Sequence, residues 1–242
     1  DFSFGEFPEN FEHFQHYLEA SLKRVPILKE AGIRKFFAGP ESFTPDTNSL
    51  LGEVPEVKNL FLSCGLNSIG IGSGGGVGKV TAEWLMNGHI NEDIFNYDIK
   101  RFQKFHSSLG FIKNRITETL GDLYGMHWPF KQHKTSRNVM TTPYHEELSK
   151  VGACFGVSGG YERPMWFAQN EKKPEYEYSY NYQNWYPSVE FETKNASENV
   201  GLFDLTPFSK FEIQGENAHE ELQKLCTANI KNEIGKCTYT QM

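Results

Sequence analysis

Glycine is concentrated in one short segment of this chain. Seven of the fourteen residues from Gly65 to Gly78 are glycine. The segment follows Phe61–Ser63, which reads as the end of a short buried strand, and precedes Val80–Asn87, whose pattern predicts a helix with Gly88 as its C-cap. Because glycine lacks a Cβ, such a strand–turn–helix lets backbone amides approach a flat or anionic ligand, although a tight packing turn has the same composition.

The glycine spacing also matches a dinucleotide-binding motif in its literal form. Gly70, Gly72 and Gly75 have the spacing G-x-G-x-x-G. The motif further requires an acidic residue about twenty positions on, at the end of the next strand. That region is the polar run INEDIFNYD at residues 90–98, which is not a clear strand. We therefore do not interpret the segment as the binding site for the ADP half of a dinucleotide.

Composition narrows the classes of partner. The chain has 242 residues, a length that favours one large domain or two partial domains. It contains 24 Lys and Arg residues and 31 Asp and Glu residues. The absence of a basic block argues against nucleic acid and anionic membranes as main partners, and no apolar run is long enough to span a membrane. Four widely spaced cysteines favour reduced, mostly buried thiols. Both ends read as internal sequence, so we expect a fragment of a longer protein.

Periodicity predicts a mixed α/β or α+β chain. The helices and strands are expected at the following positions. Helices are predicted over 10–29 with an end near Pro26, over 111–124 with Ile112, Ile116, Leu120 and Leu123 on one face, and over 142–151, 191–198 and 217–226. Strands are predicted at 33–38, 210–214 and 237–241, and the alternating tyrosines 176, 178, 180 and 182 resemble one face of a strand.

A change of composition suggests a domain junction. Residues 126–142 are rich in His, Lys, Ser, Thr and Asn, with prolines at 129 and 143 near the end. We predict one domain over 1–125, a connecting region over 126–151 and a second domain over 152–242. At the start of the second domain, Glu162 and Arg163 are either a ligand-binding pair or, with more weight, a buried ion pair.

Two other kinds of chemistry are disfavoured. His13 and His16 lie one helical turn apart beside Glu12, which is more often polar surface than a metal site. The GVSGG segment at 156–160 is not a nucleophile elbow, so a hydrolase is not expected.

Several ordered motifs resemble the mitochondrial sarcosine and dimethylglycine dehydrogenases. They are GPESFTPD at 39–46, the run from Leu50 to Lys79, YDIKRF at 97–102, TSRNVMTTPYHEEL at 135–148, GACFGVSGGYERPMWF at 152–167 and VGLFDLTPFSKFEIQG at 200–215. The resemblance covers essentially the whole chain and is nearer to sarcosine dehydrogenase. It implies the C-terminal part of an FAD-dependent amine-oxidase-type domain, followed by the start of an aminomethyltransferase-like, folate-binding domain.

The resemblance also implies an activity and a site. The activity is oxidative demethylation of sarcosine in the mitochondrial matrix, with FAD and tetrahydrofolate as cofactors and an electron-transfer flavoprotein as acceptor. The residues expected against the flavin ring are Pro40, Glu41, Ser42, Phe43, Thr44, Gly65, Leu66, Asn67, Ser68, Ile69 and Gly70. Catalytic residues are not identified, and no metal site is expected.

Two departures leave alternatives open. Single-domain sarcosine oxidases have a substrate-binding Lys where Gly72 stands and a flavin-linking Cys where Gly39 stands. The dehydrogenases resemble one another in a flavin-linking His that lies outside this chain, so we expect the chain alone not to bind FAD tightly. Dimethylglycine dehydrogenase, and the non-catalytic regulatory subunit of pyruvate dehydrogenase phosphatase, share the architecture and remain possible.

Overall fold

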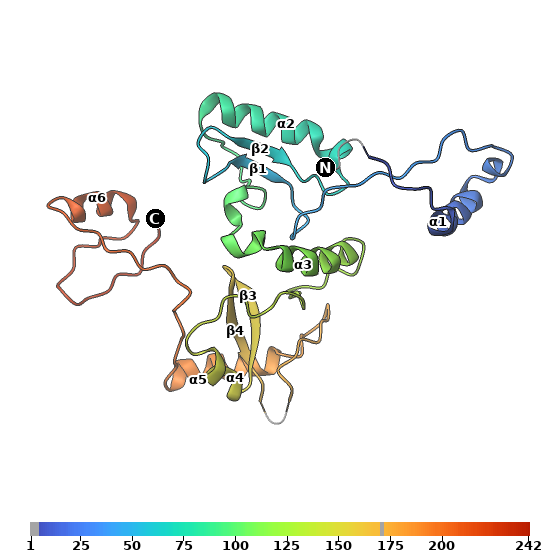
Figure 1. The fold of residues 1–242 in the computed structure, drawn as a ribbon. Coiled ribbons are helices and arrows are strands. Elements are labelled where there is room, and N and C mark those ends of the chain that lie inside the picture. Colours follow the sequence, from blue (N-terminus) through green and yellow to red (C-terminus); the bar gives the residue numbers. More distant parts are fainter. Residues whose placement is uncertain (1–4, 170–171) are drawn as a thin grey trace.

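Two antiparallel hairpins organise the structure. The computed structural model describes residues 5–169 and 172–242 (Figure 1). Strand β1 (Leu50–Glu53) pairs with β2 (Phe61–Cys64), and β3 (Ala153–Ser158) pairs with β4 (Tyr161–Phe167). Helices lie beside both hairpins, which confirms the expected mixture of helix and strand.

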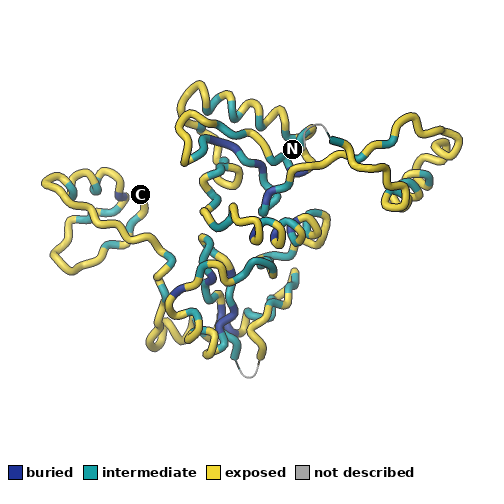
Figure 2. Tube along the Cα trace, in the orientation of Figure 1, coloured by how far each residue is buried: buried dark blue, intermediate teal, exposed yellow. Residues whose placement is uncertain are grey.

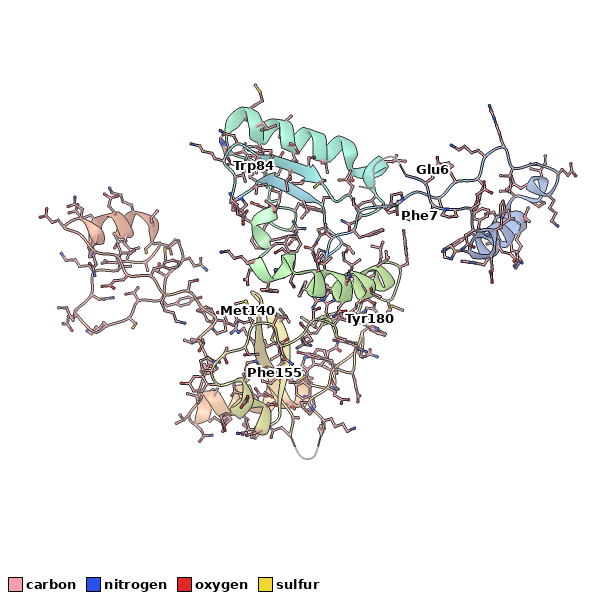
Figure 3. The ribbon with its side chains drawn as sticks, viewed as in Figure 1. Glu6, Phe7, Trp84, Met140, Phe155 and Tyr180 are labelled. Atoms are coloured by element: carbon pink, nitrogen blue, oxygen red, sulfur yellow. The ribbon has the colours of Figure 1, made fainter. Side chains whose placement is uncertain are left out.

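Helix α2 (Gly70–Asn87) packs on the first hairpin through Trp84 (Figure 3). The Trp84 ring meets the ring of Phe61 edge-on, with centroids 6.0 Å apart. At Gly52 the backbone has φ of +106°, and a Cβ there would lie 2.6 Å from the Trp84 ring. Glycine is therefore required at this position of β1, both by its φ and by the close approach of the indole.

The glycine-rich segment is mostly helix rather than turn. The turn ends at Ile69 and α2 starts at Gly70, so the prediction that the helix begins near Val80 is wrong. Glycine weakens an isolated helix, but tertiary packing supplies most helical stability in proteins, and here Trp84 provides such packing. The predicted C-cap is confirmed, because Gly88 has φ of +73° and its N–H donates to the Trp84 carbonyl oxygen.

A middle region connects the hairpins. It contains two short 3₁₀ helices, η2 (Ile99–Arg101) and η3 (Lys104–Ser107), and the helix α3 (Leu109–Asp122). The helix predicted over 111–124 is confirmed to within two residues at each end. Its buried residues are Phe111, Arg115 and Thr119, whereas Leu120 of the predicted apolar face is 41% exposed. Polar bonds from α3 to the following segment set this orientation.

The segment after α3 is bound to that helix by hydrogen bonds. The Glu118 carboxylate accepts bonds from the Lys134 N–H (2.7 Å), the Thr135 N–H (2.8 Å) and the Thr135 hydroxyl. The Arg115 guanidinium donates to the Thr135 carbonyl oxygen at 2.6 Å. Part of the predicted connecting region is thus held against α3 by polar contacts, while its boundaries as a domain junction stay a prediction.

The second hairpin contributes several buried residues to a core of its own. Ala153, Cys154 and Trp166 are each less than 5% exposed. Helix α4 (His145–Lys150) contacts both strands, and α5 (Tyr186–Glu198) lies along β4, where Glu192 accepts a bond from the Phe167 N–H at 2.8 Å. These contacts enclose a small core around the strand pair.

A buried ion pair lies in this core. Glu162 is 1% exposed, and its carboxylate accepts two bonds from the Arg137 guanidinium (2.7 and 2.5 Å) and one from the Asn138 N–H (2.8 Å). The sequence therefore indicated a buried ion pair correctly but named the wrong partner. Arg163 instead lies over the ring of Phe208, with 5.0 Å to the centroid, because neighbouring residues on a strand point to opposite faces.

The alternating tyrosines do not form a strand. Tyr176 and Tyr178 stack on each other with ring centroids 5.7 Å apart, and both meet the Trp185 ring edge-on. Strand geometry requires a neighbouring strand for its hydrogen bonds, and no such pairing is described for this segment. The prediction of a strand here is wrong, while the prediction of packing is consistent with these ring contacts.

Two segments near the ends of the chain, here called the two arms, extend away from the hairpins (Figure 1). They carry α1 (Phe11–Arg24) with the 3₁₀ turn η1 (Pro26–Lys29), and α6 (Ala218–Leu225). Helix α1 ends two residues before Pro26, as the sequence suggested. The strands predicted at 33–38, 210–214 and 237–241 are absent from the described residues; only a single bridge joins Ala38 to Phe7.

The chain exposes far more surface than a compact monomer of its mass. Its accessible surface is 19027 Å², whereas a compact monomer of this mass exposes about 11,000 Å². Figure 2 shows that the two arms are largely exposed. Among the described helices none is long and apolar enough to cross a membrane.

The buried ion pair makes a testable prediction about stability. Replacing Glu162 with Gln removes the charge that neutralises Arg137, and we expect the free energy of unfolding to fall by about 3 kcal/mol. Urea unfolding followed by tryptophan fluorescence measures this change, because Trp166 is buried in the same core. The matched control is Glu190→Gln, since Glu190 is exposed; equal stability of the two variants would contradict the prediction.

The same pair predicts a dependence on pH. Burial alone raises the pKa of the Glu162 carboxyl, but bonds from Arg137 and Asn138 outweigh burial and hold the pKa below 4.5. The stabilisation is therefore complete above that ordinary pKa and is lost as the pH falls through the folded-state pKa. We expect Glu162→Gln to show a smaller loss of stability on acidification than the parent chain.

Candidate functional site

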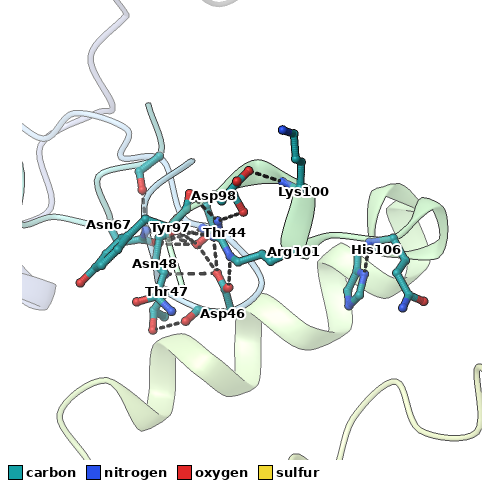
Figure 4. A network of polar contacts seen from close by, with 12 residues as sticks. Thr44, Asp46, Thr47, Asn48, Asn67, Tyr97, Asp98, Lys100, Arg101 and His106 are labelled. Atoms are coloured by element: carbon teal, nitrogen blue, oxygen red, sulfur yellow. Dashed lines mark hydrogen bonds and ion pairs between the residues drawn. The ribbon is translucent and has the colours of Figure 1, made fainter. Parts of the chain in front are cut away.

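The structure brings the two segments of the expected site together. The Asn67 N–H donates to the Ser42 carbonyl oxygen at 3.2 Å, and the Asn67 side-chain oxygen accepts from the Thr44 N–H at 2.9 Å (Figure 4). The Ser68 hydroxyl donates to the Glu41 carboxylate at 2.8 Å. Residues 40–44 and 65–70, more than twenty positions apart in the sequence, thus form one unit.

The expected site residues divide into an exposed rim and a buried support. The exposed members are Pro40, Glu41, Ser42, Ser68 and Ile69; those of intermediate exposure are Phe43, Gly65, Leu66 and Gly70; and the buried members are Thr44 and Asn67. The rim is therefore accessible to a ligand, while the two buried side chains connect the segments beneath it.

The turn has a left-handed backbone at three positions. The φ values are +65° at Gly65, +49° at Asn67 and +67° at Ser68. A Cβ at Gly65 would lie 2.9 Å from the Thr44 methyl group, so glycine is required by space as well as by φ. Asn is among the non-glycine residues that adopt this conformation most readily. This backbone leads directly into α2.

The start of α2 offers main-chain donors. The N-cap residue is Ile69, and no side chain forms a capping hydrogen bond with the start of the helix. The first N–H groups of a helix have no partner within the helix. Apart from the backbone of the helix itself and the neighbouring residues, no atom lies within 4 Å of the position that a Cβ would occupy at Gly72, Gly75 or Gly76. The arrangement can therefore accept a flat group with a partial negative charge close to the backbone.

A second polar group supports the same loop. Arg101 donates to both carboxylate oxygens of Asp46, at 2.6 and 3.0 Å (Figure 4). It also donates to the main-chain oxygens of Asn48, Tyr97 and Asp98. Arg101 lies in η2, so this bidentate pair joins the loop after Thr44 to the middle region of the fold.

An apolar cavity of about 560 Å³ lies between this loop and α3. Phe43, Ile112 and Ile116 are among its walls, and His106 is a polar group in it. Burial lowers the pKa of His106, and its Nδ1 accepts a bond from the Gln103 N–H at 2.9 Å. The lowered pKa favours the neutral imidazole, and because Nδ1 accepts a hydrogen bond, the proton of that neutral form lies on Nε2.

A more polar cavity of about 530 Å³ lies beside the second hairpin. Its walls include Arg137, His145, Cys154 and Tyr176. Burial raises the pKa of the Cys154 thiol to about 11, so the thiol is protonated at neutral pH and is not an activated nucleophile. All four cysteines are free, with Cys154 and Cys226 buried and Cys64 and Cys237 exposed.

Among the residues that the structure describes, one group of side chains has a spacing that suits a metal ion. Ligand atoms of Glu118, Asp122 and His133 lie within 4.8 Å of one another. However, Glu118 already accepts bonds from the 134–135 segment, and Asp122 pairs with Lys131 at 2.6 Å. These bonds occupy the carboxylates and compete with a metal.

Sequence reasoning missed several polar pairs that support the site or the second hairpin. Asp46 and Arg101 are both present in the quoted motifs, at the end of GPESFTPD and inside YDIKRF, but nothing in their spacing indicates that they meet. The same holds for Arg137, which lies 25 positions before its partner Glu162. Such pairs require the tertiary fold to become visible.

Family comparisons cover the chain in three consecutive parts. Residues 1–84 match the family described as FAD dependent oxidoreductase, and residues 87–142 match the FAD dependent oxidoreductase central domain. Residues 144–242 match the GCVT N-terminal domain. The candidate rim at 40–44 and 65–70 thus lies in the oxidoreductase part.

Curated relatives align with nearly the whole chain. A 4-methylaminobutanoate oxidase (formaldehyde-forming) from Paenarthrobacter nicotinovorans is 44% identical over 98% of this chain, and human mitochondrial sarcosine dehydrogenase is 33% identical over 100% of it. The chain belongs to the sarcosine and dimethylglycine dehydrogenase family. A pyruvate dehydrogenase phosphatase regulatory subunit from mouse mitochondria is 34% identical over 97% of this chain.

The chain spans less than a third of the length of these relatives. It covers 29% of the 4-methylaminobutanoate oxidase, 29% of human sarcosine dehydrogenase and 27% of the mouse regulatory subunit. The identity and order of the matched parts agree with the architecture that the sequence motifs suggested.

The pair of Arg101 with Asp46 makes a testable prediction for this family member. Arg101→Lys keeps the charge but loses the planar fork that binds both carboxylate oxygens. We expect native-state hydrogen exchange at Leu51 to accelerate about thirtyfold, equivalent to ~2 kcal/mol. The Leu51 N–H is a suitable probe because it donates to Tyr97 O, which also accepts from Arg101.

The control is a second Arg→Lys change at an exposed position. Arg34 is exposed, so Arg34→Lys should leave exchange at Leu51 unchanged. Equal exchange in Arg101→Lys, Arg34→Lys and the parent chain would show that the ion pair does not stabilise the loop.

Proposed function

We propose that this chain forms the flavin-facing wall of an enzyme that oxidises the N-methyl group of an amino acid with FAD. The observation that carries the proposal is the bonded pairing of residues 40–44 with 65–70 at the uncapped start of α2. The match of residues 1–84 to FAD dependent oxidoreductases supports it.

The residues present fit an isoalloxazine ring. We propose that the exposed rim, with Pro40, Ser42 and Ile69 among its members, contacts the ring, while Thr44 and Asn67 hold the two segments in place. Free N–H groups at the start of α2 would favour the negative charge that the reduced flavin carries. The absence of Cβ atoms at Gly72 and Gly75 leaves room for a planar group beside the helix.

The cofactor supplies, when bound, the acceptor for the hydride that leaves the N-methyl carbon. In this proposal the chain contributes orientation and a fixed electrostatic field. Residues 144–242 would begin the domain in which tetrahydrofolate accepts the one-carbon unit, and their match to the GCVT N-terminal domain supports this role. We propose an electron-transfer flavoprotein as the final acceptor.

We propose sarcosine as the preferred substrate, within the wider class of N-methylated amino acids. Relatives named as sarcosine dehydrogenase and dimethylglycine dehydrogenase support this class. The name of the 44% identical relative specifies a longer N-methyl amino acid, 4-methylaminobutanoate. The mitochondrial names of several relatives support a matrix location, whereas that relative is bacterial.

A second candidate function is regulation without catalysis. The mouse relative named as a regulatory subunit of pyruvate dehydrogenase phosphatase is as similar to this chain as human sarcosine dehydrogenase is. A regulatory protein would keep the same packed loops without oxidising an amine.

The absorbance spectrum of the protein at its full encoded length tests the proposal. We expect a yellow protein whose flavin absorbance is bleached anaerobically by sarcosine, because hydride transfer reduces the flavin. Dimethylglycine and 4-methylaminobutanoate define the preference within the class, and glycine is the control because it lacks an N-methyl carbon.

Three results distinguish the candidates. Bleaching by an N-methyl amino acid but not by glycine supports the enzyme. A yellow protein that none of the three amines reduces, or a colourless protein, contradicts the proposed oxidation and favours the regulatory function.

A further inference from the structure

We infer that Asn67 is a positioning residue of the flavin site, whose side-chain amide locks residues 40–44 to the turn 65–70 without contacting the ligand. The inference rests on the proposed function and deepens it, because it names the group that sets the shape of the rim. It also separates Asn67 from the exposed residues that contact the ring.

The amide group of Asn67 is occupied within the protein. Its Oδ1 accepts from the Thr44 N–H at 2.9 Å, and its Nδ2 donates to the Gly65 carbonyl oxygen at 2.5 Å and the Thr44 hydroxyl at 3.2 Å. Asn67 is only 2% exposed. Since both ends of the amide are bound and the residue is out of solvent, the side chain acts on a ligand only through the segments it joins.

The backbone of Asn67 completes the connection. Its N–H donates to Ser42 O at 3.2 Å, and its φ of +49° directs the chain toward the exposed Ser68 and Ile69. The rim is therefore fixed from below by four hydrogen bonds of one residue. A residue at this place needs a donor and an acceptor on a short side chain and must tolerate positive φ, and Asn meets all three needs.

The other side of Thr44 is fixed independently. The Thr44 hydroxyl lies 3.1 Å from an Asp46 carboxylate oxygen and 2.9 Å from Asn48 O, and Arg101 binds both of those residues (Figure 4). Thr44 thus has one support from the turn and one from the middle region. Removing the Asn67 amide releases only the first, so the loop should shift without general unfolding.

The test is Asn67→Gly, with Asn59→Gly as the matched control. Glycine accepts the positive φ, so the change removes the amide without adding backbone strain. Asn59 has a similar φ of +64° but is exposed in the β1–β2 turn. We expect hydrogen exchange at the Thr44 amide to accelerate at least about tenfold in Asn67→Gly, equivalent to ~1.4 kcal/mol, and to stay unchanged in Asn59→Gly.

The flavin-bearing protein at full length gives the second readout. We expect Asn67→Gly to change the flavin absorbance maximum and to lower the reduction potential, because the main-chain donors are no longer held in place. A lower melting temperature with unchanged flavin spectrum and potential would overturn the inference while leaving the proposed function intact. A parent protein without flavin would overturn the proposed function and, with it, this role of Asn67.

Discussion

The hydrogen bonds of Thr44 are the constraint on which the upper part of the structure depends. This residue is 4% exposed; its N–H is bound by Asn67, and its hydroxyl lies within hydrogen-bond distance of Asn67, Asp46 and Asn48. Because buried polar groups are costly when unpaired, these bonds select one arrangement of the loop. That arrangement places two distant segments at the start of α2 and joins them to η2 through Arg101.

The lower part uses the same principle with charges. The carboxylate of Glu162 is buried and is satisfied by Arg137 and the Asn138 N–H, which connects β4 to the segment after α3. Glu118 and Arg115 bind that segment from the other side. A succession of buried polar contacts, rather than a continuous apolar core, therefore runs from α3 to the second hairpin. Such contacts require particular partners, which makes the arrangement specific.

The large exposed surface of the chain can be compared with the greater length of its relatives. A surface of 19027 Å² leaves many apolar side chains in solvent, among them Phe203, Phe211 and Ile234. The relatives that this chain matches are more than three times as long. The hairpins and their polar contacts are formed entirely by residues of this chain. The arms, by contrast, are largely exposed (Figure 2).

The sequence by itself determined the family, the mixture of helices and strands, and features that depend on local chemistry. The Gly88 C-cap, the end of α1 before Pro26 and the strand at Phe61 are examples, because each follows from conformational preferences of nearby residues. It also selected the segments 40–44 and 65–70, through motifs. Only the tertiary structure decided that Gly70–Gly78 is helical, that Glu162 pairs with Arg137, and that Asn67 is buried beneath the rim. Those outcomes depend on contacts between residues far apart in the chain, whose energies exceed local propensities and leave no periodic pattern in the sequence.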